Sequence, residues 1–334
     1  PHAIIAVPRF DRYQEISSQL MDTLADFSPR VEALSMDEAF VEMTGAERLF
    51  GPPREMGRRI KQAVREATGL DISVGVASTK YVAKVASAHD KPDGLTVVPA
   101  AGARAWLAPL PVSRLWGAGP KTVPRLHALG LLTIGDVARA NAGRLGSLGA
   151  HFHALANATD PRPVHRTHVA KSIGSDQTLV ADVSRREDIE LHLRRSADRI
   201  GRRLRAKGYV ARGVRVRLKT RRFQMLSRQC KLQRPIDLGG ELLAAGQSLL
   251  DRFGDAGPFR LVGMAAFDLA VRDGDRQLDL FEDLAARELE TTVDDLMQRF
   301  GRGVLMRARD LAESGTVVGD GVNLDYLERV DGPA

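Results

Sequence analysis

The chain has 334 residues and is 43% hydrophobic, so it is long enough and apolar enough for two or three packed domains. Its single cysteine, Cys230, excludes an intramolecular disulfide and a cysteine-based zinc site. No apolar run approaches the roughly eighteen residues of a membrane span, no signal peptide opens the sequence, and the single cysteine suits a reducing cytosol. We therefore expect a cytoplasmic protein that no segment anchors in a membrane. The net charge is +7, but the charge is unevenly distributed, since residues 166–235 contain 20 Lys and Arg and only 6 Asp and Glu. This basic block predicts a polyanionic partner, with nucleic acid as the first choice and an acidic membrane as the second.

Residues 1–98 alternate between strand and helix patterns. Apolar residues at helical spacing predict helices at residues 11–27, 53–68 and 79–89. Alternating or β-branched runs predict strands at residues 3–7, 31–34, 39–43, 71–77 and 95–98. This order favours an antiparallel sheet backed by helices. Because the chain begins inside a strand pattern, we expect sequence to be missing upstream.

Two adjacent acids, Asp37 and Glu38, stand at the fold between the strands expected at residues 31–34 and 39–43. Neighbours in a regular strand face opposite sides, but at a tight junction both carboxylates can converge on one point above the sheet. Unpaired acids in an apolar hairpin are costly, and a divalent cation such as Mg²⁺, which prefers oxygen ligands, would relieve that cost. The alternative is a surface hairpin whose acids face water.

The segment SMDEAFVEMTG, followed by SVGVASTKYVAKVASAHDKPDGLTVV, resembles the palm of a Y-family DNA polymerase of the bacterial DNA polymerase IV type. The resemblance implies that Asp37 and Glu38 bind metal, that Glu38 is the catalytic carboxylate, and that Lys91 contacts the incoming triphosphate. The family begins with a strand bearing another metal-binding Asp and with a fingers subdomain, and this sequence starts after both. The resemblance therefore implies an incomplete palm and a chain that is inactive on its own.

Residues 99–165 lose the strand pattern and become helical. Gly117 and Gly119, followed by Lys121 and Thr122, resemble a helix-hairpin-helix, in which glycines let the backbone approach a phosphate and the N–H groups opening the next helix bind it. The alternative is an ordinary glycine-containing turn between helices. In the family this region is the thumb, and we expect a linker at residues 166–171 after it.

Residues 172–270 predict the order strand, helix, strand, strand, helix, strand, which is the split βαβ plan. In the third element Arg215, Arg217 and Lys219 alternate with apolar residues and would share one face. A sheet with a cationic face can follow a phosphate backbone without reading sequence, so these residues, with Ser172, are assigned to DNA binding. Aromatic residues are sparse, which favours duplex over single-stranded DNA. The matching domain of the family is the little finger.

The chain from residue 271 onward is acidic. It contains Gln277, Leu278, Leu280 and Phe281 in a QLDLF segment that resembles the bacterial sliding-clamp binding peptide, whose apolar side chains anchor in a pocket. The alternative is that Leu280 and Phe281 pack within this chain. A helix is expected at residues 284–300 and a loose end beyond residue 315.

These features predict an α+β multidomain protein, and the resemblance implies that it acts as a DNA-directed DNA polymerase in translesion synthesis. By resemblance, two Mg²⁺ ions, which Mn²⁺ could replace, would activate the primer 3′-hydroxyl and the deoxynucleoside triphosphate. The expected partners are primer–template duplex and the sliding clamp, and the expected state is a monomer. Two competing interpretations are a non-catalytic adaptor between DNA and the clamp, which has no need of the acid pair, and a nucleotidyl cyclase with a similar palm, which the basic block disfavours.

Overall fold

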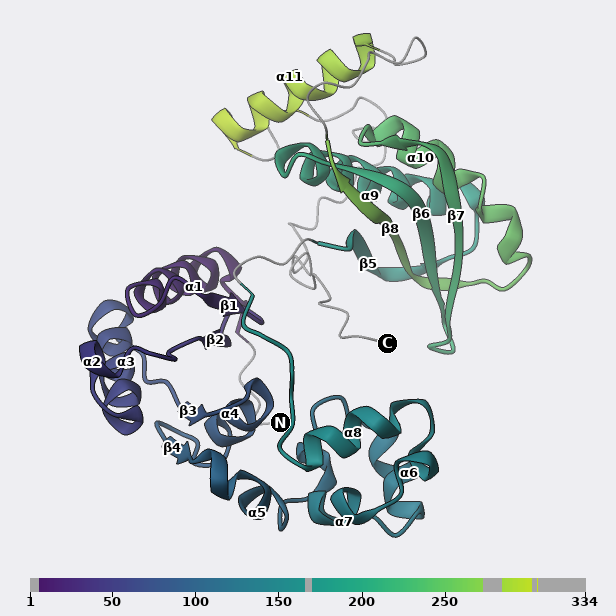
Figure 1. Cartoon of the computed structure of the whole chain (residues 1–334). Coiled ribbons are helices and arrows are strands. Elements are labelled where there is room, and N and C mark those ends of the chain that lie inside the picture. Colours follow the sequence, from purple (N-terminus) through teal and green to yellow (C-terminus); the bar gives the residue numbers. More distant parts are fainter. Residues whose placement is uncertain (1–5, 166–169, 273–283, 302–304, 306–334) are drawn as a thin grey trace. The chain divides into compact units, whose positions relative to one another are not determined.

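The computed structural model describes residues 6–165, 170–272, 284–301 and 305. The chain divides into two compact units, one made by Arg9–His168 and a second that holds Val169–Ala334. Figure 1 labels the elements of both units. Among the described residues, no helix is long and apolar enough to cross a membrane.

The first unit opens with helices and short strands. Its elements are α1 (Phe10–Ala25), β1 (Val31–Ala33), β2 (Ala39–Val41), α2 (Glu47–Phe50), α3 (Pro53–Thr68), β3 (Val74–Ala77), α4 (Lys80–Ser87) and β4 (Leu95–Val98). Helix α3 has the predicted bounds, because a proline stands at its first position and Gly69 ends it with a φ of 72°. Helix α4 begins after Thr79, whose side chain accepts a hydrogen bond from the Val82 N–H at 3.4 Å.

The prediction of one antiparallel sheet is wrong at β3 and β4. Strands β1 and β2 do pair antiparallel, but β3 and β4 pair in parallel, with Val74 opposite Leu95. Helix α4 connects these two strands, and a helical crossover returns the chain in its original direction, whereas an antiparallel pair can use a short hairpin. The strand expected at residues 71–77 begins at Val74. Of the strand expected at residues 3–7, the first part lies outside the described residues and the end is not a strand.

The rest of the first unit is helical, as predicted. The helices are α5 (Ala103–Leu107), α6 (Thr122–Ala128), α7 (Ile134–Arg139) and α8 (Gly149–Ala156), with short 3₁₀ turns between them. Tyr81, Leu107, Ile134 and Phe152 are fully buried in one hydrophobic core. Because this core joins α4 to the later helices, the position of α4 is fixed, and so are the starting points of its side chains on the opposite face.

The second unit is a four-stranded sheet with helices packed on one face (Figure 1). Its elements are β5 (Ser172–Val183), α9 (Arg186–Ala206), β6 (Tyr209–Thr220), β7 (Met225–Ile236), α10 (Gly239–Gln247), a 3₁₀ turn (Leu250–Phe253), β8 (Phe259–Val271) and α11 (Leu284–Phe300). The element order through β8 is the predicted one, and the strands lie in the order β5-β8-β6-β7, each antiparallel to its neighbours. Val214, Val216 and Leu218 of β6 are buried beneath α9 and α10.

Helix α11 docks on the second unit through charged side chains. Asp237 is 1% exposed and accepts hydrogen bonds from Arg272 Nη1 at 3.0 Å and from Arg287 Nη2 at 2.6 Å. Arg205 of α9 pairs with Glu290 of α11 at 2.6 Å. Glu290 also accepts from the Gly239 N–H that opens α10, at 2.9 Å. Ion pairs with buried partners therefore help to attach this helix to the second unit.

Candidate active site and nucleic-acid surfaces

The predicted acid pair lies at the turn of the β1–β2 hairpin. The N–H groups of Leu34 and Ser35 donate to the carbonyl oxygen of Glu38 at 2.8 and 3.2 Å, which closes the turn. Ser35 Oγ donates to Asp37 Oδ1 at 2.5 Å and accepts from the Glu38 N–H at 3.1 Å. Ser35 thus fixes both the backbone and one carboxylate of the turn. Asp37 and Glu38 are both exposed, so a cation could reach them from solvent.

The Glu38 carboxylate is held by Lys84 of α4. Lys84 Nζ lies 2.9 Å from Oε1 and 2.7 Å from Oε2, and the two side chains are 29% and 45% exposed. The sequence patterns did not predict Lys84 as a residue of the site. The signal that could have identified it is its spacing from Lys80, since residues four apart share one face of a helix.

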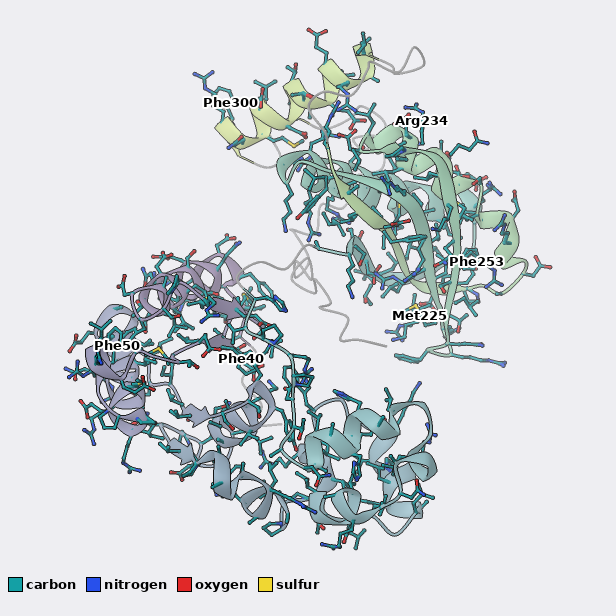
Figure 2. The ribbon with its side chains drawn as sticks, viewed as in Figure 1. Phe40, Phe50, Met225, Arg234, Phe253 and Phe300 are labelled. Carbon is teal, nitrogen blue, oxygen red and sulfur yellow. The ribbon has the colours of Figure 1, made fainter. Side chains whose placement is uncertain are left out.

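Lys80 makes the matching contact one helical turn earlier, in a buried setting. Its Nζ lies 2.6 Å from both carboxylate oxygens of Glu32 on β1, and the two side chains are 8% and 4% exposed. Glu32 also accepts from the His165 N–H at 2.8 Å. Phe40, labelled in Figure 2, is the register partner of Glu32, and its ring lies 5.1 Å from Lys80 Nζ. Two Lys–Glu pairs therefore attach the hairpin to α4. The Lys80–Glu32 pair is buried, and the Lys84–Glu38 pair is more exposed and includes one acid of the predicted metal site.

Replacing Lys80 with Met should destabilise the first unit by about 3 kcal/mol, because the Glu32 carboxylate would stay buried without its counter-ion. Lys84→Met removes a more exposed pair and should cost less than about 1 kcal/mol. Urea unfolding followed by tryptophan fluorescence measures both losses, since Trp106 and Trp116, the two tryptophans of the chain, lie in this unit. Equal losses in the two variants would contradict the difference in burial.

The residues at the hairpin turn fit a divalent cation in part. Asp37 and Glu38 supply carboxylate oxygens, and Mg²⁺ is commonly held by one or two carboxylates together with waters and substrate phosphates. Within the described ranges, no group of three or more His, Cys, Asp or Glu side chains is placed to hold a metal ion. The pair can therefore contribute ligands, and the remaining ligands must come from outside this group of residues.

Lys91, predicted to contact a triphosphate, is exposed in the turn before β4. Asp93 in that turn accepts hydrogen bonds from Lys61 and Arg65 of α3, the latter at 3.2 Å. A Cβ at Gly94 would lie 1.9 Å from the Asp90 carbonyl oxygen, so the turn requires glycine there. Lys91 is therefore carried on a turn that is fixed to α3.

The turn predicted as a helix-hairpin-helix runs directly into α6. Gly117 has a φ of 95°, a conformation that favours glycine. The Gly119 N–H donates to the Gly117 carbonyl at 3.0 Å, and the Thr122 N–H donates to the Gly119 carbonyl at 2.9 Å. Lys121 is exposed and precedes the first helical residue. Two of the N–H groups considered for phosphate are thus used within the turn, and phosphate binding here stays a prediction.

Trp116 links this turn to the acid pair, a contact that sequence analysis did not identify. The Trp116 ring lies 5.7 Å from the Phe40 ring and 5.7 Å from Lys84 Nζ. The Arg162 guanidinium lies 4.2 Å from the same ring and pairs with Asp160 at 2.7 Å. Burial acts to raise the pKa of Asp160, but hydrogen bonds led by that from Arg162 lower the pKa overall, which keeps this carboxylate charged.

The cationic residues predicted on β6 alternate with buried apolar residues, as expected, but they differ in their contacts. Arg217 Nη2 lies 2.8 Å from a carboxylate oxygen of Asp176 on β5. Gly263 of β8 lies between these two residues in register, and a Cβ there would lie 1.9 Å from Asp176 Oδ1. Arg215 Nε donates to a side-chain oxygen on β7 at 2.8 Å, and Lys219 Nζ lies 5.1 Å from an aromatic ring. Arg217 is therefore the most neutralised of the three.

The structure does not test two further predicted sites, Ser172 and the clamp-binding residues. Ser172 begins β5 opposite Phe267 of β8 and is partly buried. The predicted clamp-binding residues Gln277, Leu278, Leu280 and Phe281 lie outside the described residues. Both assignments stay predictions.

Known proteins resemble this chain over most of its length. The impB/mucB/samB family model matches residues 1–88, and the impB/mucB/samB family C-terminal domain matches residues 170–280. DNA polymerase IV of Moorella thermoacetica is 37% identical over 96% of this chain and 82% of that protein, and DNA polymerase IV of Caulobacter vibrioides is 34% identical over 93% and 79%. A solved Y-family DNA polymerase chimera shares 22% identity with a TM-score of 0.73, covering 81% of this chain and 80% of that one, which shows a common fold.

Proposed function

The chain belongs to the DNA polymerase IV family, and from that premise we propose that it catalyses template-directed DNA synthesis past lesions. The observation that carries this proposal is the turn of the β1–β2 hairpin, where Asp37 and Glu38 are exposed and held in place. A protein that only recruited other proteins would have no need of two such carboxylates. Polymerases of this family use divalent metal ions. We propose that Asp37 and Glu38 bind two Mg²⁺ together with further ligands that these two residues do not supply.

The chain's own residues prepare the reaction by position and charge. When bound, the metal ions would activate the primer 3′-hydroxyl and neutralise charge on the triphosphate. Ser35 holds the Asp37 carboxylate and the Glu38 backbone, and Lys84 holds the Glu38 carboxylate, so both carboxylates are oriented before substrates arrive. We assign Glu38 as the catalytic carboxylate. Lys91 would bind the triphosphate as a point charge from its fixed turn.

We assign residues 1–98 to a palm, 99–165 to a thumb, 172–270 to a little finger and 166–171 to the linker before it. The division of the chain into two compact units at residue 168 supports the linker assignment. The core shared by α4 and the later helices supports a thumb packed directly on the palm. Residues 271–334 would carry the clamp-binding segment, α11 and a tail.

The proposed substrates are a primer–template duplex and a deoxynucleoside triphosphate, and the proposed partner is a sliding clamp that binds the QLDLF segment. The basic block at residues 166–235 and the alternation on β6 support backbone contact with duplex DNA. The exposed turn around Lys121 supports a second backbone contact. Nothing in these contacts requires a second copy of the chain, and we propose a monomer.

Primer extension by the full-length protein, on templates with and without a lesion, tests the proposed function. We expect extension past the lesion that requires a divalent cation. A folded protein that binds the duplex but extends neither primer would contradict the proposal.

Replacing Arg215 and Lys219 with Ala should weaken duplex binding and flatten its salt dependence. Each lost phosphate contact lowers the slope of log affinity against log salt by about 0.9, so the double variant should lose up to about 1.8. Arg217→Ala should change the slope less, because its guanidinium already pairs with Asp176. Fluorescence anisotropy of a labelled duplex over a salt series measures the slopes. If the folded double variant keeps the original slope, this face of the sheet does not bind DNA.

A further inference from the structure

Lys84 places a positive charge directly on the carboxylate of Glu38, the predicted metal ligand. Its ammonium donates to both carboxylate oxygens, at 2.9 and 2.7 Å. An ammonium has only donors, and this one uses one lone pair on each of the two carboxylate oxygens. A divalent cation at the same carboxylate would be repelled by the ammonium at close range. Metal binding at Glu38 is therefore favoured when Lys84 moves away.

The surroundings of Lys84 allow that movement without loss of the fold. The inner pair, Lys80 with Glu32, is nearly fully buried and keeps the hairpin on α4 when the outer pair opens. Lys84 is 29% exposed, so its ammonium can leave Glu38 for solvent. The Trp116 ring already lies 5.7 Å from Lys84 Nζ, and this contact can keep the ammonium near the acid pair after it leaves Glu38.

We propose that Lys84 is a positioning residue that holds Glu38 in the metal-free protein and is displaced when the divalent cation binds. This inference rests on the proposed function, in which Glu38 is a metal ligand. Its consequence is that the free protein binds metal more weakly than the two carboxylates alone would allow. A triphosphate supplies negative charge that attracts both the divalent cation and the displaced Lys84 ammonium. Tight metal binding is therefore coupled to the arrival of the nucleotide.

Titration with Mn²⁺, followed by electron paramagnetic resonance of the free ion without DNA or nucleotide, tests this role. Lys84→Gln should bind Mn²⁺ about fivefold more tightly, the ratio that corresponds to an exposed ion pair. Lys84→Met, which keeps an unbranched stem against Trp116, should do the same, and Lys84→Arg should restore the original affinity. Arg139→Gln removes one positive charge from another exposed ion pair of this unit and should leave Mn²⁺ affinity unchanged.

Glu38→Gln separates this inference from the proposed metal site. If Glu38→Gln leaves Mn²⁺ affinity unchanged, the metal assignment and the role of Lys84 both fail. If Glu38→Gln weakens binding but the two neutral variants of Lys84 do not tighten it, the metal site stands and the role of Lys84 is overturned. A purely structural Lys84 predicts equal or weaker Mn²⁺ binding by the two neutral variants, whereas our proposal predicts tighter binding.

Discussion

Replacing Asp37 or Glu38 with Ala in the full-length protein should slow primer extension by at least about a hundredfold, because metal-assisted charge stabilisation contributes several kcal/mol to the transition state. Duplex affinity should stay within about twofold, since phosphate contacts from basic side chains supply most of it. Single-turnover primer extension measures the rate, and anisotropy of a labelled duplex measures binding.

Glu42 provides a matched control for this loss. It is an acid of the same hairpin region, but its carboxylate accepts hydrogen bonds from Thr44, which lower its pKa. Glu42→Ala removes one negative charge and should leave the extension rate within about threefold. The assignment of Asp37 and Glu38 would be wrong if either Ala variant kept more than about a tenth of the original rate.

Replacing both Leu280 and Phe281 with Ala should abolish binding to a sliding clamp and processive synthesis. These two large apolar side chains are flanked in sequence by Asp279, Glu282 and Asp283, which would be forced toward the interior if the pair filled the chain's own core. In an apolar pocket the pair could contribute roughly 3–5 kcal/mol before ordering costs, which leaves an affinity near micromolar. Surface plasmon resonance on immobilised clamp measures the affinity, and extension in the presence of a competitor trap measures processivity.

Two leucines just after this segment provide the control. Leu284 and Leu289 of α11 are 56% and 65% exposed, so replacing both with Ala removes similar apolar surface outside the motif and should leave clamp affinity unchanged. The Leu280 and Phe281 double variant should also keep its melting temperature. A drop of several degrees together with persistent clamp binding would show instead that the motif packs within the chain.

Local signals in the sequence predicted most of the elements. Helix α3 was predictable to the residue because Pro53 and Gly69 mark its ends, and the hairpin turn at Asp37 was predictable because strand alternation breaks there. The parallel pairing of β3 and β4 was not predicted, because strand direction depends on which strands meet and on how α4 crosses between them. That choice is made by tertiary packing, which short sequence patterns do not report.

The sequence predicted the acids of the candidate site but not the residues that hold them. Glu32 and Lys80 are 48 positions apart, and their pairing follows from how the hairpin docks on α4. The pairing of Arg217 with Asp176 depends on a third strand, where Gly263 leaves room between them. A motif records the type of residue at a site, whereas these contacts depend on the space that other elements leave.

The hydrogen bonds to the Asp237 carboxylate limit where this protein can be truncated without loss of the folded second unit. It receives Arg272, which precedes residues 273–283, and Arg287, which follows them, so the chain entering that stretch and the chain leaving it are fixed to the same buried group. A truncation placed just after the QLDLF segment would delete Arg287 and Glu290 and remove partners from Asp237, from Arg205 and from the start of α10. Shortened forms intended to keep the second unit intact should therefore end after Phe300, because a stop before Leu284 removes part of the folded unit and not merely a tail.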